Sequence, residues 1–146
     1  MIDQKIFDNN RDFHGVKGIV FIGEKMIVYR RDTNTNSFPL YIDLPGGGKE
    51  KNESPFETFK RELEEEFGIE INKEDVKFSK KYMSVMDSTK ESYFIVTKPL
   101  EIKENDIIFG NEGLEYFLIN PKEYLKLADG IKRQQDKVAD YLNTLK

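Results

Sequence analysis

The stretch LPGGGKEKNESPFETFKRELEEEFGI, residues 44–69, contains the signals that decide the fold. Its second half predicts a helix over Ser54–Phe67, because Ser54 is a favourable N-cap residue and Glu57 completes a Ser-x-x-Glu capping box. A proline at the first helical position and a glycine after the last turn agree with these bounds. The apolar stripe that would pack this helix against a sheet consists of Phe56, Phe59, Leu63 and Phe67.

Short runs rich in Val, Ile, Phe and Tyr flank this helix on both sides and predict β-strands. Val16–Ile22 and Met26–Arg31, separated by a three-residue turn, are predicted to pair as a β-hairpin, and the polar segment Asp32–Pro39 is expected to be a loop. The remaining predicted strands are Leu40–Leu44, Val76–Met86, Tyr93–Thr97 and Leu114–Ile119, and the remaining predicted helices are Pro121–Leu127 and Ile131–Leu145. Strands interleaved with helices indicate an α/β fold in which a mixed β-sheet is flanked by helices.

The composition indicates one globular domain, which we assign to residues 1–146. The absence of cysteine excludes disulfides and thiolate ligands, and the single histidine, His14, argues against a histidine-based metal site or catalytic triad. No apolar run is long enough to cross a membrane, and the first residues are too polar for a signal peptide. A cytoplasmic location is therefore expected.

The net charge of −4 is concentrated in one segment. Residues 50–70 contain eight Glu and three basic residues, a net charge of −5, so the rest of the chain is almost balanced at +1. Because proteins that bind nucleic acid usually present a basic surface, bulk nucleic-acid binding is not expected. The local excess of negative charge is instead consistent with a site for divalent cations.

Three of these glutamates, Glu62, Glu65 and Glu66, stand at positions i, i+3 and i+4 of the predicted helix, within an arc of about 100°. The arc borders the apolar stripe, so mutual repulsion of the carboxylates destabilises the helix or raises a pKa. A divalent cation relieves this repulsion, and oxygen ligands without Cys or His favour Mg²⁺ or Mn²⁺ over zinc. Arg61 can pair with either Glu57 or Glu65 from its position on the same helix.

The spacing of glycines and charged residues in this stretch resembles the Nudix box of the Nudix hydrolase family, including its MutT-like members. Every fixed position of the box is matched, by Gly47, Glu53, Arg61-Glu62-Leu63, Glu65-Glu66 and Gly68-Ile69. A complete match is rare by chance, so the box from Gly47 to Ile69 is a specific signal. The resemblance implies an α/β/α sandwich and a hydrolase that cleaves a diphosphate linkage with the help of Mg²⁺ or Mn²⁺.

The resemblance also implies roles for individual residues of the box. The implied metal ligands are Glu62, Glu65, Glu66 and the backbone carbonyl of Gly46. Arg61 corresponds to the residue that orients Glu65, and Glu53 corresponds to an additional metal-site group. Members of the family place the general base either within the box or on a loop outside it.

A second segment, Gly110-Asn111-Glu112-Gly113, resembles the Gly-x-Glu-Gly segment that supplies a further metal-site glutamate in MutT-type members. It makes Glu112 a candidate for the general base or for a fourth carboxylate ligand. Outside these motifs, Arg30 and Arg31 end a predicted strand and are candidates for binding a phosphate group, although surface arginines are common at such positions.

These features predict a Mg²⁺-dependent Nudix hydrolase in which water attacks a nucleoside triphosphate or another nucleoside diphosphate derivative. Dinucleoside polyphosphates and the 5′ end of RNA are alternative substrates, and the balanced charge outside the box argues against RNA. A module that binds nucleotides without catalysis is a further alternative, but it would be expected to lack a glutamate of the box. The C-terminal helix, about residues 131–145, is expected to pack on the sheet, in a monomer or a homodimer.

Overall fold

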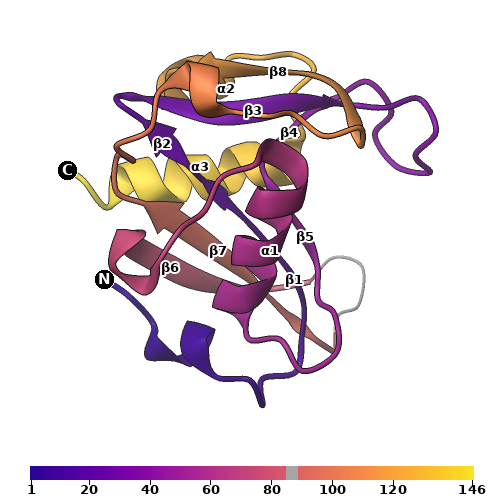
Figure 1. Cartoon of the computed structure of the whole chain (residues 1–146). Helices are drawn as coiled ribbons and strands as arrows, with labels where there is room; N and C mark the ends of the chain where they lie inside the picture. Colours follow the sequence, from indigo (N-terminus) through magenta and orange to yellow (C-terminus); the bar gives the residue numbers. More distant parts are fainter. Residues whose placement is uncertain (85–88) are drawn as a thin grey trace.

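The structure of the chain is a computed structural model that describes residues 1–84 and 89–146. Within these residues, helices pack on both faces of two four-stranded β-sheets (Figure 1). None of these helices is long and apolar enough to span a membrane. The strands are β1 Phe13–Ile19, β2 Phe21–Ile22, β3 Lys25–Arg31, β4 Ile42–Asp43, β5 Gly46–Gly48, β6 Val76–Met83, β7 Glu91–Thr97 and β8 Gly113–Ile119. The α-helices are α1 Pro55–Phe67, α2 Pro121–Tyr124 and α3 Lys132–Asn143, and the 3₁₀ helices are η1 Gln4–Phe7, η2 Lys73–Asp75 and η3 Glu104–Asp106.

The first sheet is mixed and has the strand order β5-β1-β7-β6. β1 runs parallel to β7 and antiparallel to β5, and β6 is antiparallel to β7. The second sheet is antiparallel, since β2 and β4 pair in succession with one edge of β3 and β8 pairs with its other edge. The predicted mixed sheet flanked by helices is therefore confirmed, and the structure adds a second, antiparallel sheet to it.

The run Val16–Ile22, predicted as one strand, is divided between the two sheets. β1 ends at Ile19 in the first sheet, and β2 begins at Phe21 in the second. Ile19 and Val20 are both fully buried but belong to different hydrophobic clusters, so the continuous apolar stretch 19–22 conceals the break. The predicted hairpin is confirmed only for the short β2 arm, which pairs with the start of β3 through a turn at Gly23, where φ is +62°.

Other predicted elements are present with shorter bounds. β4 covers only Ile42–Asp43, because Leu40 adopts a left-handed backbone conformation, with φ +66°, that does not continue a strand. The predicted strand Val76–Met86 forms β6 as far as Met83, and its residues 85–86 lie outside the described residues. The two predicted C-terminal helices are present as α2 and α3, each shorter than its predicted range.

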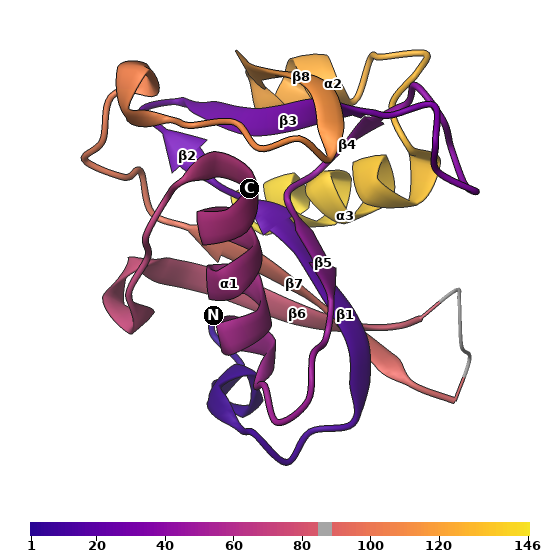
Figure 2. The ribbon, with the colours of Figure 1, turned by 45° about the vertical axis from the view of Figure 1, so that its right-hand side comes forward.

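Alternate side chains of the strands point into two separate hydrophobic cores. On β3, Ile27 and Tyr29 face the first core, whereas Met26 and Val28 face the second. α1 contributes its apolar stripe to the first core, and α3 contributes its buried apolar residues to the second. Figure 2 shows these two helices on different sides of the strands. Helices on opposite faces of the strands establish the α/β/α sandwich.

α1 begins and ends where the sequence predicts. The Ser54 hydroxyl accepts a hydrogen bond from the Glu57 amide at 3.1 Å, and the Glu57 carboxylate accepts one from the Ser54 amide at 2.9 Å. Gly68 ends the helix in the left-handed conformation, with φ +63°. A later segment returns to this helix end, where the Gly110 amide donates to the Glu66 carbonyl at 2.7 Å. This contact fixes the segment before β8 beside α1.

Candidate metal centre and adjoining cavities

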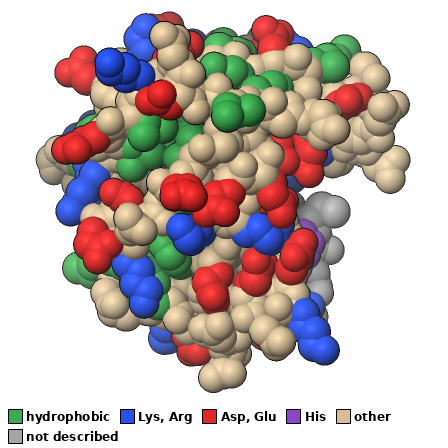
Figure 3. All heavy atoms as spheres, viewed as in Figure 1, with side chains coloured by type: hydrophobic (Ala, Val, Ile, Leu, Met, Phe, Trp, Pro, Cys, Tyr) green, Lys and Arg blue, Asp and Glu red, His purple; other side chains and the backbone are tan. Residues whose placement is uncertain are grey.

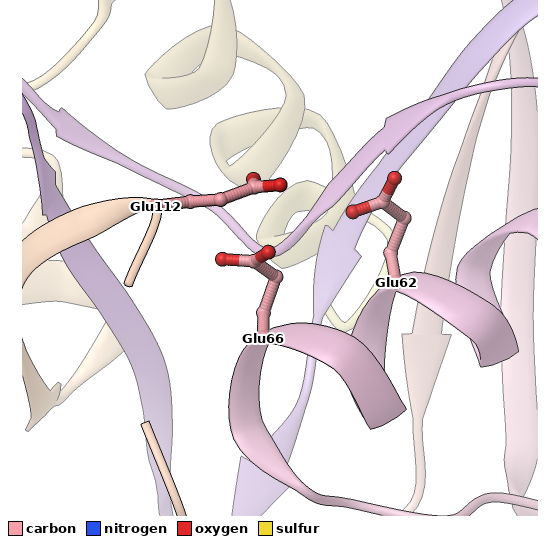
Figure 4. A group of neighbouring side chains, drawn as sticks. All are labelled: Glu62, Glu66 and Glu112. Atoms are coloured by element: carbon pink, nitrogen blue, oxygen red, sulfur yellow. The ribbon is translucent and has the colours of Figure 1, made fainter. Parts of the chain in front are cut away.

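Three carboxylates from two separate segments converge beside α1 (Figure 4). Glu62 and Glu66 project from successive turns of α1, and Glu112 reaches them from the segment before β8. One oxygen atom of each lies within 4.8 Å of the others. The structure thus brings two glutamates of the box together with the glutamate of the Gly-x-Glu-Gly segment.

The carboxylate cluster, formed by Glu62, Glu66 and Glu112, is partly buried. Glu66 is 5% exposed, and its Oε2 atom has no hydrogen-bond partner among the described residues. Without a cation, burial and the adjacent Glu112 carboxylate raise the pKa of Glu66 to about 8, and burial raises the pKa of Glu62. Because buried carboxylates are costly unless their charge is compensated, these oxygen donors fit a hard divalent cation.

The glycines of β5 allow Glu62 to approach the strand. A Cβ atom on Gly47 would lie 2.6 Å from the Glu62 carboxyl carbon, closer than real side chains approach, so a larger residue at this position would displace the Glu62 carboxylate. The preceding Gly46 has φ +130°, which also favours glycine. Its carbonyl oxygen accepts a hydrogen bond from Lys17 Nζ at 3.4 Å, so the structure gives this predicted ligand an ammonium partner.

Arg61 is the centre of a hydrogen-bonded network beside the carboxylate cluster. Its guanidinium donates to both carboxylate oxygens of Glu53, at 2.7 and 3.2 Å, and to the Gly48 carbonyl at 2.9 Å. It also donates to Glu62 at 3.1 Å and to Glu65 at 3.2 Å. The sequence allows Arg61 to pair with Glu57 or with Glu65, and in the structure it pairs with Glu65. Its bond to the Gly48 carbonyl also connects α1 to β5.

Glu65 and Glu53 lie beside the carboxylate cluster and contact Arg61. The side chain of Glu65 is 52% exposed. Against the effect of burial, hydrogen bonds from Arg61, from the Glu50 amide and from the Thr58 hydroxyl lower the pKa of Glu53. Acidic side chains accordingly crowd around basic ones across this face of the molecule (Figure 3).

The two candidate phosphate-binding arginines hold the loop between β3 and β4. The hydrogen-bond partners of Arg30 are Glu115, Asp129 and the Leu40 carbonyl, and those of Arg31 are Asp43, Thr35 and the Ser37 carbonyl. Arg31 also borders two cavities that adjoin the carboxylate cluster. Arg30 and Arg31 therefore have different surroundings, because Arg31 borders the cavities. The side chains of both form hydrogen bonds within the protein.

The two cavities adjoin the carboxylate cluster at different residues. The larger cavity, about 560 Å³, is bounded by β1, β5, β6, β7 and α3, and it is bordered by Gly47, which contacts Glu62. The smaller cavity, about 330 Å³, is bounded by the loop after β3 and by Asn111 and Glu112. A diphosphate at the carboxylate cluster would therefore have space for further groups in two directions.

Several residues at the site carry no sequence signal. Lys17 Nζ donates to the buried Asp43 carboxylate at 3.0 Å, and Arg31 donates to the same group at 2.9 Å. In the sequence, Lys17 is an ordinary polar residue of a strand and Asp43 precedes a turn, so neither stands out. Gln134 and Lys137 border the larger cavity from α3. The sequence indicates only that their three-residue spacing places them on one face of a helix.

An α/β/α sandwich with a carboxylate cluster on a capped helix, held against a glycine strand by an arginine, defines the Nudix class of folds. The NUDIX domain family matches residues 13–141, nearly the whole chain. The chain therefore belongs to the Nudix family, as its box predicts, and with it to the hydrolases that act on phosphorus-containing acid anhydrides.

Solved structures of other proteins share this fold. A MutT protein from Methanosarcina mazei Go1 superposes with a TM-score of 0.73 at 21% identity, over 94% of this chain and 98% of that one. A bifunctional NMN adenylyltransferase/ADP ribose pyrophosphatase from Francisella tularensis gives a TM-score of 0.72 at 17% identity, over 90% of this chain and 41% of that one. A C. elegans Ap4A hydrolase gives a TM-score of 0.68 at 14% identity, over 90% of this chain and 97% of that one. Comparison of the sequence with curated proteins finds no match.

Proposed function

We propose that the protein is a Mg²⁺-dependent enzyme that hydrolyses a diphosphate linkage in a nucleoside triphosphate or another nucleoside diphosphate derivative. The convergence of Glu62, Glu66 and Glu112, with an unpartnered oxygen on Glu66, is the observation that carries this proposal. The two cavities beside the cluster support a substrate that extends beyond the diphosphate. Similar folds named ADP ribose pyrophosphatase and Ap4A hydrolase are consistent with this substrate class.

The proposed ligands of the cation are the members of the carboxylate cluster, together with further candidates from the box. They are Glu62, Glu66 and Glu112, with Glu53, Glu65 and the Gly46 carbonyl as the further candidates. Bound there, Mg²⁺ or Mn²⁺ would neutralise the diphosphate and lower the pKa of an attacking water. Arg61 acts as a positioning residue in this proposal, because it joins Glu53, Glu62 and Glu65 to the β5 backbone.

Glu65 and Glu112 are the two candidates for the general base that takes a proton from the attacking water. Arg61 orients the Glu65 carboxylate through a 3.2 Å hydrogen bond, whereas Glu112 lies in the cluster at the border of the smaller cavity. Replacing a base by Gln preserves its shape and removes its proton affinity. The base is therefore the residue whose Gln variant loses the acidic limb of the pH profile of kcat, and we expect Glu112→Gln to lower kcat more than it raises KM.

The arginines have different proposed roles in substrate binding. Three of the five N–H donors of Arg31 are used internally, so the others are available to a phosphate group from its place at both cavities. Arg30 is proposed to act through the loop that it anchors. The smaller cavity favours dinucleoside polyphosphates as a second substrate candidate, because it offers space beyond Glu112. The cytoplasmic location, the single-domain organisation and the monomeric or homodimeric state stay predictions.

The test is a screen of nucleoside triphosphates, nucleotide sugars, dinucleoside polyphosphates and 5′-triphosphorylated RNA, each with Mg²⁺ and with EDTA. We expect Mg²⁺-dependent turnover of at least one nucleotide, and ¹⁸O water will show which phosphorus is attacked. Glu62→Gln and Glu66→Gln should lower kcat by about 10²-fold or more. Glu64→Gln is the matched control, since Glu64 is an exposed glutamate of α1 whose ion pair is with Lys60. Equal loss of activity in the control, or activity retained in EDTA, would overturn the proposal.

A further inference from the structure

The outer strands of the second sheet differ in how their free edges are covered. The edge of β2 is bridged by Leu100, whose amide donates to the Phe21 carbonyl at 2.9 Å. The edge of β4 is covered by the segment before α3, since the Ile42 amide donates to the Asp129 carbonyl at 2.7 Å. Other parts of the chain therefore satisfy backbone groups along both of these edges.

The edge strands of the first sheet are also protected. On β6, the Ser79 amide donates to the Met1 carbonyl at 3.1 Å. This strand also carries three lysines, Lys77, Lys80 and Lys81. On β5, the Gly48 carbonyl accepts a hydrogen bond from Arg61 of α1 at 2.9 Å. Covering segments and edge lysines are means by which proteins prevent a strand edge from pairing with another chain.

The edge strand β8 lacks this protection. It pairs with β3 along one edge, and no backbone hydrogen bond from the rest of the described chain reaches its other edge. Its sequence, GLEYFLI, contains five apolar or aromatic residues and no lysine or proline, and none of its seven residues is buried. β8 lies at the top of the molecule in Figure 1, where hydrophobic side chains gather at the surface (Figure 3). An unprotected apolar edge of this kind is a template for another strand.

The strand best suited to this edge is β8 of a second copy of the chain. Two antiparallel copies of one strand pair around a twofold axis, and the identical strand is present wherever the protein is. The register of β8 with β3 shifts at Leu114, so the regular part of the strand is residues 115–119, with Phe117 at its centre. An axis at Phe117 pairs the whole regular part with itself and joins the two antiparallel sheets into one.

The charges and side chains of β8 are compatible with this register. Glu115 lies opposite Ile119 of the second copy, and Tyr116 lies opposite Leu118 of the second copy. Glu115 is the single charged residue of the strand and accepts a hydrogen bond from Arg30 at 2.9 Å, so its charge is compensated within its own chain. No carboxylate faces another, and pairs of aromatic and aliphatic side chains stabilise antiparallel strands.

We propose that the protein forms a homodimer in which the free edges of two β8 strands pair antiparallel around Phe117. The proposal selects one of the two oligomeric states that the sequence leaves open and names the surface that forms the contact. It does not depend on the proposed hydrolase function, because it rests on the backbone of β8 and on the residues around it.

Sedimentation equilibrium and amide hydrogen exchange test the proposal without substrate or metal. Between about 1 and 200 µM protein, we expect the mass to rise from that of one chain to that of two. Amides of residues 115–119 should exchange more slowly in the concentrated sample, whereas those of β6 should exchange equally in both samples. A monomer at every concentration, or a dimer whose β8 amides exchange as they do in the monomer, would overturn the proposal.

Two variants at one position test the register. Ile119→Lys places an ammonium opposite Glu115 of the second copy, whereas Ile119→Glu places a carboxylate there, and both lose the same apolar side chain. Because each contact occurs twice in a twofold dimer, the dissociation constant of the Glu variant should exceed that of the Lys variant by about 10-fold or more. Equal dissociation constants, or the opposite order, would overturn the pairing around Phe117.

Met83→Glu is the matched control for these variants. Met83 is an apolar residue, 61% exposed, at the end of the other sheet's edge strand β6. Its replacement should leave the dissociation constant of the dimer within about 2-fold of that of the unmodified protein. Dissociation of the dimer by this variant would place the contact elsewhere and overturn the proposal, and thermal unfolding verifies that each variant is folded.

Discussion

Gly47 and Gly48 are adjacent in β5, but a side chain at each would meet different surroundings. A Cβ atom at position 47 would lie 2.6 Å from the Glu62 carboxyl carbon, whereas one at position 48 has the His14 carbonyl oxygen at 3.9 Å. Gly47→Ala is therefore expected to displace Glu62 and to reduce Mg²⁺ affinity and kcat by about 10-fold or more. Gly48→Ala should reduce Mg²⁺ affinity and kcat far less. Calorimetric Mg²⁺ titration and steady-state kinetics compare the two variants. Equal losses in both variants would contradict a specific role of Gly47.

The sequence predicted part of the grouping of the carboxylates at the site. Three glutamates on one arc of a helix were expected as a group, and Glu62 and Glu66 do converge. The structure turns Glu65 to Arg61 and completes the cluster with Glu112. Helical spacing fixes which side chains share a face, but the rotamer of a glutamate depends on partners from other segments, which spacing does not reveal.

The capping box of α1 is a local element that should contribute to stability without entering catalysis. The buried Ser54 hydroxyl accepts from the Glu57 amide at 3.1 Å at the helix start, two turns before Glu62. Ser54→Ala is expected to lower the free energy of unfolding by about 1 kcal/mol, the usual cost of losing an N-cap. Urea denaturation measures this change. At a temperature where the variant is fully folded, its kcat should stay near that of the unmodified protein. A large loss of kcat would contradict a role of the capping box in stability alone.

The segment that brings Glu112 to α1 depends on close backbone contact at Gly110. Its amide donates to the Glu66 carbonyl at 2.7 Å, and a Cβ atom there would lie 2.9 Å from the Glu65 carbonyl oxygen. Gly110→Ala is expected to shift the segment and to lower kcat by about 10-fold or more, because a displaced catalytic group is costly. Ile108→Ala, which removes an exposed side chain from the same segment, is the control. Comparable kinetics of the two variants would refute this placement of Glu112.

The helices and strands were predictable where local signals are strong. α1 has its N-cap, proline and terminal glycine within a few residues, and these place its two ends. The break at Val20 was not predictable, because an apolar run buried on both sides shows no alternation that would reveal a change of sheet. The left-handed conformation of Leu40, which shortens β4, was equally hidden, since such a conformation is uncommon outside glycine.

The arrangement of the whole molecule explains why the cavities had no sequence signal. The larger cavity is bounded by both sheets and α3, and its lining comes from segments as distant as His14 and Lys137. A hydrophobic pattern predicts which face of an element is buried, but the gap left between several packed elements depends on their relative placement. From the sequence, the polar residues of α3 are therefore expected to form an ordinary solvated face. In the structure, several of them border a cavity.

The negative charge of the carboxylate cluster should make the stability of the whole domain depend on pH and on metal. In EDTA, burial and Glu112 raise the pKa of Glu66 from about 4.5 to about 8, so between these values the folded protein binds more protons than the unfolded chain. The free energy of unfolding must then fall as the pH rises through this window, by about 1–3 kcal/mol in total. The lowered pKa of Glu53 affects stability only at pH values below this window. The stability that the ionised Glu53 contributes is lost as the pH falls through its folded-state pKa.

We therefore expect the Tm in EDTA to fall by about 3–8 °C between pH 5.5 and pH 8, since about 1 kcal/mol shifts the Tm of a domain of this size by roughly 2–4 °C. Saturating Mg²⁺ should remove the decline, because the cation stabilises the ionised carboxylates and binds the folded state. Glu66→Gln should also flatten the profile in EDTA and should lose the stabilisation by Mg²⁺, whereas Glu64→Gln, on the exposed side of α1, should keep both effects. Differential scanning calorimetry at several pH values, in EDTA and in Mg²⁺, measures the profiles of all three proteins. A Tm of the unmodified protein that is constant or rises with pH in EDTA would show that the cluster is not a strained, cation-requiring centre.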